Sequence, residues 1–354
     1  MDISPIIQTK SRIVTAARVA KMRAAAILPL ALTGLPTAHA WGALGHSTVA
    51  FIAQQLVQPK TTTWAQGILS DTSANYLANI STWADSYRSQ PGGAFTSPFH
   101  YIDAQDSPPS SCNVDYDRDC SASGCVVSAI ANYTRRVTQT SLSKQERNYA
   151  LRFIVHFLGD VHQPLHNENY AIGGNDVDVT FAGASRNLHG IWDTQIPERI
   201  RGAAYSVAEA KEWATELVTE VKSGSYSASA ASWKTVNIND AKNQALKWSN
   251  EANDYVCTAV APKGWTVLES GDLATNGYYK SVMPTIEIQI ARAGVRLAAW
   301  LDALAGVPKS YARDAAPEVD LSGRDLLPSK RRLTRAQLMR RAAGVGCGCG
   351  DHEH

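Results

Sequence analysis

The sequence of 354 residues lacks several features that would point at once to a common class of protein. It has no internal repeat, no Cys-x-x-Cys pair of the kind that binds metals, and no surplus of basic residues in its central part. Residues 1–40 carry five Lys or Arg and one acid, and residues 311–354 carry eight and six, so residues 41–310 hold 21 basic and 25 acidic side chains. This net charge of −4 argues against a broad basic surface for nucleic acid, although bound metal ions could still supply positive charge at a site.

The first 40 residues have the pattern of a secretory signal peptide. Five basic residues, from Lys10 to Arg23, precede the apolar run 24–37, and Ala38-His39-Ala40 follows it as a small-x-small cleavage site. The apolar run is too short to span a bilayer. We therefore predict a secreted protein, not bound to a membrane, whose mature chain begins at Trp41; Met22 is an alternative start.

The cysteines of the exported part are even in number, which favours disulfides in an oxidising compartment. They are Cys112, Cys120, Cys125 and Cys257. Spacing alone permits three pairings, of which one joins the close pair Cys120 and Cys125 in a short loop. Asn79 and Asn132 each begin an Asn-x-Ser/Thr sequon and are predicted glycosylation sites in a host that glycosylates.

Apolar periodicity predicts one mainly α-helical domain over residues 41–307. We expect helices at residues 45–57, 143–158, 208–221, 240–256 and 285–304, the second opened by a capping box of Ser143 and Glu146. Alternating residues at 176–181 predict a strand, with Gly183 in a turn that would complete a small β-hairpin. Residues 308–354 become basic and are predicted to be a disordered or removable tail.

Histidines are unevenly placed along this domain. Residues 190–310 contain none, whereas residues 41–189 contain six. His156 and Asp160 are four residues apart in a predicted helix, so both project from one face, and His189 and Asp193 repeat this spacing. Pro164 should end the helix and turn His166 back toward the same region.

Imidazoles mixed with carboxylates are the ligands that Zn²⁺ prefers, and this chain offers enough candidates for more than one ion. Closely spaced metal ions suit phosphodiester hydrolysis because one activates water while others neutralise the phosphate and the leaving oxygen. The residues themselves therefore favour a hydrolytic zinc site.

Short motifs follow one another in a fixed order along residues 41–305. They are Trp41, His46, Trp83-Ala84-Asp85, Arg88, Phe99-His100-Tyr101-Ile102-Asp103, His156 with Asp160, Gln163-Pro164-Leu165-His166, Gly173-Gly174-Asn175, and Asn187-Leu188-His189 with Trp192-Asp193. This set resembles the S1/P1 nuclease family of fungi and plants, to which bacterial three-zinc phospholipases C are related.

The resemblance implies a mostly helical fold of the three-zinc phospholipase C and nuclease type. It assigns the first Zn²⁺ to Asp85, His100, His156 and Asp160, the second to His166, His189 and Asp193, and the third to Trp41, His46 and Asp160. Trp41 would bind through its free amino nitrogen and carbonyl oxygen, so signal cleavage would form part of the site. The resemblance also supports the disulfides Cys112–Cys257 and Cys120–Cys125.

The activity that the resemblance implies is cleavage of single-stranded DNA and RNA to 5′-phosphate products, with release of phosphate from 3′-nucleotides. In-line attack of water on phosphorus would be assisted by Arg88, Asp85 and Asp160. Single strands are expected because a base must leave its stack to enter a cleft.

Substrate contacts follow from the same resemblance and concern residues outside the metal ligands. Asp103 would hydrogen-bond a nucleobase, Tyr101 would stack on it, and Asn175 would also contact the substrate. His162 matches no ligand and is expected behind the ligands or on the surface. The enzyme is expected to act as a monomer.

Two alternatives remain open at this stage. A phospholipase C-type lipid phosphodiesterase would share the ligand plan, but those enzymes tend to have Glu where this chain has Asp193. A secreted zinc-binding protein without activity is the other, and the intact ligand set with Arg88 argues against it.

Overall fold

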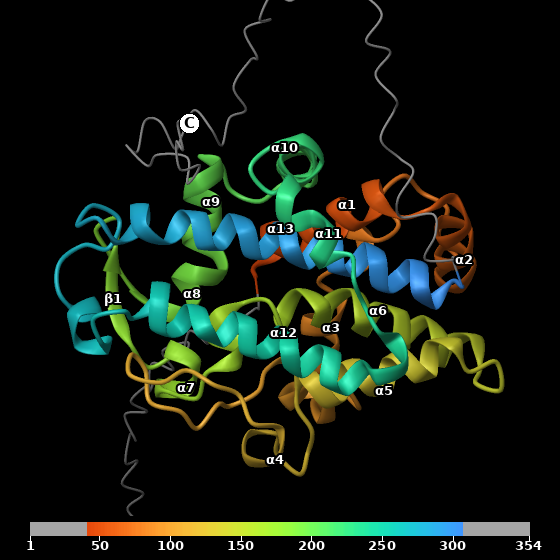
Figure 1. Ribbon diagram of the computed structural model, residues 1–354, viewed down its shortest axis with the longest axis horizontal. Coiled ribbons are helices and arrows are strands. Elements are labelled where there is room, and N and C mark those ends of the chain that lie inside the picture. The colour runs from red at the N-terminus through yellow and green to blue at the C-terminus, as the bar shows by residue number, and fades with distance from the viewer. Residues whose placement is uncertain (1–40, 307–354) are drawn as a thin grey trace, which may run out of the picture. The chain divides into compact units, whose positions relative to one another are not determined.

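Helices make up most of the protein between residues 41 and 306, the part of the chain that the computed structural model describes (Figure 1). The prediction of a mainly α fold with one small hairpin is confirmed. The predicted signal peptide and the predicted tail lie outside the described residues. Among the helices of residues 41–306, none has the length and apolar character needed to cross a membrane.

The longer helices are α1 (Ala43–Leu56), α2 (Pro59–Leu69), α5 (Val126–Thr138), α6 (Lys144–Asp160), α10 (Val207–Ser223), α12 (Ala241–Tyr255) and α13 (Tyr278–Leu304). Shorter ones are α3 (Trp83–Arg88), α4 (Tyr116–Asp119), α7 (Ala171–Gly174), α8 (Leu188–Gly190), α9 (Ile196–Arg201) and α11 (Ser227–Trp233). Further short 3₁₀- or π-helical segments are η1 (Ala78–Ile80), η2 (Ala94–His100), η3 (Pro164–Asn167), η4 (Ile191–Gln195), η5 (Ile238–Asp240), η6 (Val256–Val260) and η7 (Trp265–Glu269).

The predicted helices are all present, with shifted ends. α6 begins at the expected capping box, in which Ser143 Oγ accepts from the amide of Glu146 at 3.2 Å. α13 begins at Tyr278 rather than at 285, and it continues through Pro284 because Val282, Met283 and Ile286 around that residue are buried. Burial of apolar side chains therefore outweighs the backbone hydrogen bond that proline lacks.

The core is built around α13, which packs against α1, α10 and α6 (Figure 1). Gly294 on α13 permits the close approach to α1, since a Cβ there would lie 2.5 Å from Ile52 Cβ. Trp248 on α12 packs edge-on against Trp300 on α13, with ring centroids 5.2 Å apart. α6, which carries two of the candidate metal ligands, is thus supported on several sides by packed helices.

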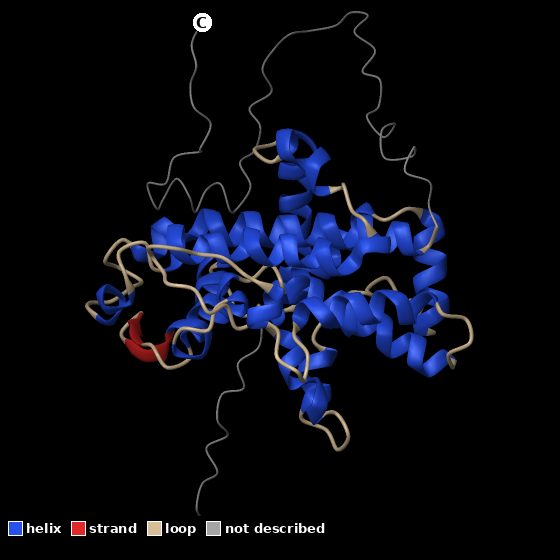
Figure 2. Ribbon diagram, turned by 60° about the horizontal axis from the view of Figure 1, so that its bottom comes forward, coloured by secondary structure: helices blue, strands red, loops and turns tan. Residues whose placement is uncertain are grey.

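The hairpin consists of β1 (Asp178–Phe181) and β2 (Ala184–Asn187), drawn in red in Figure 2. The strands are antiparallel, with Asp178 opposite Asn187 and Phe181 opposite Ala184. Ala182 and Gly183 form the turn with φ of 53° and 77°, the left-handed pair that a two-residue hairpin requires. Directly after β2 the chain enters α8, which carries His189.

Both disulfides pair as the resemblance implied, Cys112 with Cys257 and Cys120 with Cys125. Cys112 lies on the irregular segment 101–115, and Cys257 lies in η6 after α12. The amide of Val114 also donates to Asn250 Oδ1 on α12 at 2.8 Å. The segment that carries Tyr101 and Asp103 is therefore fastened to α12 at its far end.

Candidate metal centre

Three groups of buried His and Asp side chains place their nitrogen and oxygen atoms within 4.8 Å of one another. The groups are His46 with His156 and Asp160, Asp85 with His100 and His156, and His166 with His189 and Asp193. All eight residues are at most 5% exposed. The structure thus brings together every side-chain metal ligand that the sequence predicted.

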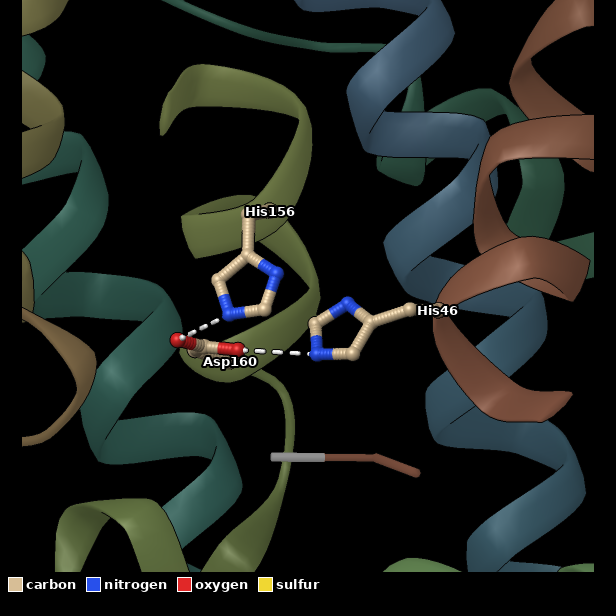
Figure 3. Close-up of side chains that lie close together, drawn as sticks. All are labelled: His46, His156 and Asp160. Atoms are coloured by element: carbon tan, nitrogen blue, oxygen red, sulfur yellow. Dashed lines mark ion pairs between the residues drawn. The ribbon is translucent and has the colours of Figure 1, made fainter. Parts of the chain in front are cut away.

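α6 supplies the centre of the first group (Figure 3). His156 and Asp160 stand one turn apart on α6, and His46 reaches them from α1. Asp160 Oδ1 lies 3.2 Å from His46 Nε2, and Asp160 Oδ2 lies 3.3 Å from His156 Nε2. The two imidazole rings stack with centroids 4.0 Å apart.

The second group shares His156 with the first and also lies against Asp160. His100 comes from the end of η2, and its Nδ1 lies 3.0 Å from Asp160 Oδ2 and 3.1 Å from His156 Nε2. Asp85 of α3 places Oδ1 3.7 Å from His100 Nδ1 and 3.6 Å from His156 Nε2. The two oxygens of Asp160 therefore face different groups, which is the arrangement of a carboxylate that bridges two ions.

The third group lies where η3, α8 and η4 meet. His166 Nε2 and His189 Nε2 are 3.0 Å apart, and His189 Nε2 is 3.1 Å from Asp193 Oδ2. Asp193 is fixed through its other oxygen, because Gln163 Nε2 donates to Asp193 Oδ1 at 2.7 Å. Sequence reasoning missed this role of Gln163, although Gln163 stood inside one of the motifs.

Backbone carbonyls determine which nitrogens of these histidines carry hydrogen. Nδ1 of His156 lies 2.7 Å from the carbonyl oxygen of Ser81, Nδ1 of His166 lies 2.7 Å from that of His100, and Nδ1 of His189 lies 2.7 Å from that of Gly173. Each Nδ1–H donates to its carbonyl, so in the neutral form of each ring Nε2 presents a lone pair.

When both rings are neutral, the Nε2 lone pairs of His166 and His189 face each other at 3.0 Å and cannot hydrogen-bond. A shared cation resolves this contact, and neutral imidazoles with carboxylates are the donors that Zn²⁺ takes. The residues present thus fit metal ions at these groups.

Charge in the site favours a cation as well. Burial opposes charge on His156, but the Asp160 and Asp85 carboxylates outweigh it and raise the pKa of His156 to about 9. Burial, together with the neighbouring His189, lowers the pKa of His166 to about 4, so this imidazole stays neutral and available as a ligand.

Trp41 is fully buried at the start of the described chain. The following amide, of Gly42, donates to the carbonyl oxygen of Asp193 at 2.7 Å, and the amide of His46 donates to the carbonyl oxygen of Gly42 at 3.2 Å. The main chain next to Trp41 is therefore bonded to two residues that carry predicted ligands.

A left-handed turn supports the third group. Ala171, Ile172, Gly173 and Gly174 have φ of 49°, 56°, 59° and 79°, a conformation that costs energy for the two residues with side chains. The turn aims the carbonyl oxygen of Gly173 at His189 Nδ1 and leaves Ile172 65% exposed.

Arg88 and the predicted substrate residues lie at the edge of the clusters. Arg88 ends α3, and its Nη2 is 3.4 Å from Asp85 Oδ1. Tyr101 is partly exposed, and burial raises the pKa of Asp103, with Asp119 adding to this effect. Asn175 Nδ2 donates to the carbonyl oxygen of Ile172 at 2.8 Å and so closes the left-handed turn.

His162, which matched no ligand, is buried rather than on the surface. Its Nδ1 lies 2.7 Å from the carbonyl oxygen of Leu158, and Arg296 Nη1 lies 2.9 Å from its Nε2. The side chain therefore packs behind the ligands against α13.

The sequence profile of the S1/P1 nuclease family matches residues 41–306. Nuclease P1 of Penicillium citrinum is 51% identical over 267 residues, which cover 75% of this chain and 98% of that protein. Nuclease S1 of Aspergillus oryzae is 46% identical over 286 residues, covering 80% of this chain and 99% of that protein. Endonuclease 3 of Arabidopsis thaliana is 31% identical over 279 residues, covering 77% and 92%.

Proposed function

The chain belongs to the S1/P1 nuclease family and is a phosphodiester hydrolase, and from this premise we propose a more specific activity. We propose that it is a secreted monomer that holds three Zn²⁺ ions, cuts single-stranded DNA and RNA to 5′-phosphate products, and releases phosphate from 3′-nucleotides. Its catalytic domain would span residues 41–307. The similarity to nucleases does not favour a phospholipase C or an inactive zinc-binding protein.

The observation that carries the metal assignment is the contact between His166 Nε2 and His189 Nε2, which lie 3.0 Å apart. Two buried imidazoles, each oriented by a carbonyl, gain nothing from this contact unless a cation lies against both. The bridging position of Asp160 extends the argument to two more ions, one with His46 and one with Asp85 and His100. Bound zinc would activate water and neutralise charge on the phosphate.

The proposal gives Trp41 a role at the ion of the first group, which His46 and Asp160 would share. Cleavage after Ala40 would free the amino nitrogen of Trp41, beside its carbonyl oxygen, as ligands next to His46 and Asp160. Support comes from the burial of Trp41 and from the hydrogen bond that holds Gly42 to Asp193.

The chain's own groups position and stabilise the substrate. The Arg88 guanidinium, 3.4 Å from Asp85, is placed to donate to phosphoryl oxygens as charge builds on them. Tyr101 would stack on a nucleobase, and Asp103 would accept from its N–H groups. Asn175 would contact the substrate from a turn that its side chain already holds in place. A duplex would have to unstack and unpair a base to use this site, at a cost of a few kcal/mol, so single strands are preferred.

The first experiment compares hydrolysis of single-stranded DNA, the same sequence as a duplex, and 3′-AMP. The protein is assayed as purified, after chelation, and after zinc is restored, with metal content measured each time. We expect activity on the single strand and on 3′-AMP that disappears with the metal and returns with zinc at three ions per chain. Zinc-loaded protein without activity on either substrate would contradict the proposal.

A second experiment tests Trp41. A variant with one alanine inserted before Trp41 should lose one of the three ions, because an amide nitrogen cannot replace the free amine. A matched variant with an alanine inserted after Gly183, in the hairpin turn, should keep all three. Three ions in both variants would remove Trp41 from the ligand set.

A further inference from the structure

A second set of buried oxygen atoms lies outside the three groups, on Asp106 and Glu168. Asp106 belongs to the irregular segment 101–115, and Glu168 follows η3. Glu168 is only 3% exposed, and the two carboxyl groups are within hydrogen-bonding reach of each other. The pair therefore joins two segments that both border the metal centre.

Each carboxyl has one satisfied oxygen and one bare oxygen. The amide of Asn113 donates to Asp106 Oδ2 at 3.0 Å, and the amide of Tyr170 donates to Glu168 Oε1 at 2.7 Å. Asp106 Oδ1 and Glu168 Oε2 are buried and accept from no donor within residues 41–306. Two facing carboxyl groups need either a shared proton or a bound cation between them, because two carboxylates have no hydrogen to offer each other.

Neighbouring side chains do not supply that charge directly. Arg118 is committed to Asp119, with Nε 2.6 Å from Oδ1 and Nη2 2.8 Å from Oδ2. Asn253, which also contacts Asp106, is fully buried and donates Nδ2 to the carbonyl oxygen of Asn167 at 2.8 Å. Its Oδ1 is a third buried oxygen without a donor among the described residues.

A cavity of about 380 Å³ opens on the pair. Asp106, Ser107, Glu168 and Asn169 line it together with Tyr170 and Trp265, whose rings stack with centroids 4.4 Å apart. The cavity leaves room for an ion with part of its water shell.

We propose that Asp106 and Glu168 bind a hard divalent cation in this cavity, with Ca²⁺ as the best match, and so fasten segment 101–115 to the end of η3. Ca²⁺ takes six to eight oxygen ligands and accepts irregular geometry, whereas Zn²⁺ favours the imidazoles that this cavity lacks among its lining residues. With two carboxylates and water as ligands, binding is weak, with a Kd on the order of 10⁻⁴ to 10⁻³ M. The bound ion would hold Tyr101 and Asp103 in register with His166.

Terbium luminescence tests the site, because Tb³⁺ replaces Ca²⁺ and is excited by nearby aromatic rings. The zinc-loaded protein is titrated with Tb³⁺ under aromatic excitation, and Ca²⁺ is then added as competitor. We expect emission that saturates and that Ca²⁺ displaces. Asp106→Asn and Glu168→Gln should each weaken Tb³⁺ binding by at least about tenfold, since each removes one charged ligand.

Two control variants make the result specific. Asp117→Asn removes an exposed carboxylate on α4 and should leave the titration unchanged. Trp265→Phe should reduce emission while Ca²⁺ still raises the melting temperature. The proposal would be overturned if emission were unchanged in both Asp106→Asn and Glu168→Gln. It would also be overturned if the wild-type protein showed neither emission nor a Ca²⁺-dependent melting temperature. In either case a shared proton would remain as the bond between the two carboxyl groups. Zinc-dependent nuclease activity is measured separately, so its failure is distinguishable.

Discussion

His156 and Asp160 stand on a long packed helix, whereas Tyr101 and Asp103 lie on a segment without regular secondary structure. The metal ligands are buried, and four of them are held by a second partner, as the carbonyl of Ser81 holds His156. The predicted substrate residues are half-exposed and are held chiefly through the path of their segment and the disulfide at its end. We expect the helix-borne ligands, called the rigid region, to set the chemistry, and the segment of Tyr101 and Asp103, called the loop region, to set which nucleotide is accepted.

Substitution of the shared ligand should have the largest effect. Asp160→Asn keeps the shape but removes the charge that two groups share, so we expect nuclease activity to fall by at least about 10³-fold with loss of zinc. Activity and metal content are measured together. Asp302→Asn, a carboxylate bonded to Thr61 on α2, is the matched control and should keep both. If Asp160→Asn keeps its full zinc content, Asp160 does not hold the metal, and the contrast between the rigid region and the loop region fails.

Loss of Arg88 should come next. Arg88→Ala removes the proposed donor to the reacting phosphate, and the expected decrease in kcat is about 10² to 10³-fold with zinc retained. Steady-state kinetics on single-stranded DNA measure it, with Arg135→Ala, on the exposed face of α5, as control. A change in KM alone would place Arg88 among the binding residues.

Gln163 lies behind the ligands, and its replacement should have a smaller effect. Gln163→Leu leaves Asp193 Oδ1 without its donor. Zinc affinity at the group of His166, His189 and Asp193 should therefore fall by about 10 to 100-fold. Competition with a graded chelator measures this, and Gln54→Leu on α1 is the control. Unchanged affinity would show that Asp193 needs no partner.

The loop region should respond in specificity rather than in rate. Asp103→Asn exchanges an acceptor for a group that both donates and accepts. The ratios of the cleavage rates on the four homopolymers should therefore change by the equivalent of about 1–3 kcal/mol in activation free energy, while zinc content stays constant. Product analysis on homopolymers measures the shift. If Asp103→Asn instead lowers all four rates equally, Asp103 supports the metal centre and the two regions are not separate.

Sequence spacing located the rigid region well and the loop region poorly. Pairs such as His189 and Asp193 can be found from their spacing, because residues four positions apart in a helix lie on the same face. Gln163 was missed because a donor to a ligand carries no periodic signal. The non-glycine residues Ala171 and Ile172 in a left-handed turn contradict local preference, and the turn that they form brings the carbonyl oxygen of Gly173 to His189.

The orientation of three imidazoles by main-chain carbonyls has a consequence for the tolerance of the site to change. No point substitution at Ser81 or Gly173 deletes a carbonyl oxygen, since every amino acid carries one. The orientation of the rings therefore depends on the course of the backbone. At Ser81 it survives a change of side chain that keeps this course, whereas at Gly173, with φ of 59°, an added Cβ would lie 2.6 Å from the carbonyl oxygen of Leu165. Relatives could diverge widely in sequence around such a centre and still load the same metals.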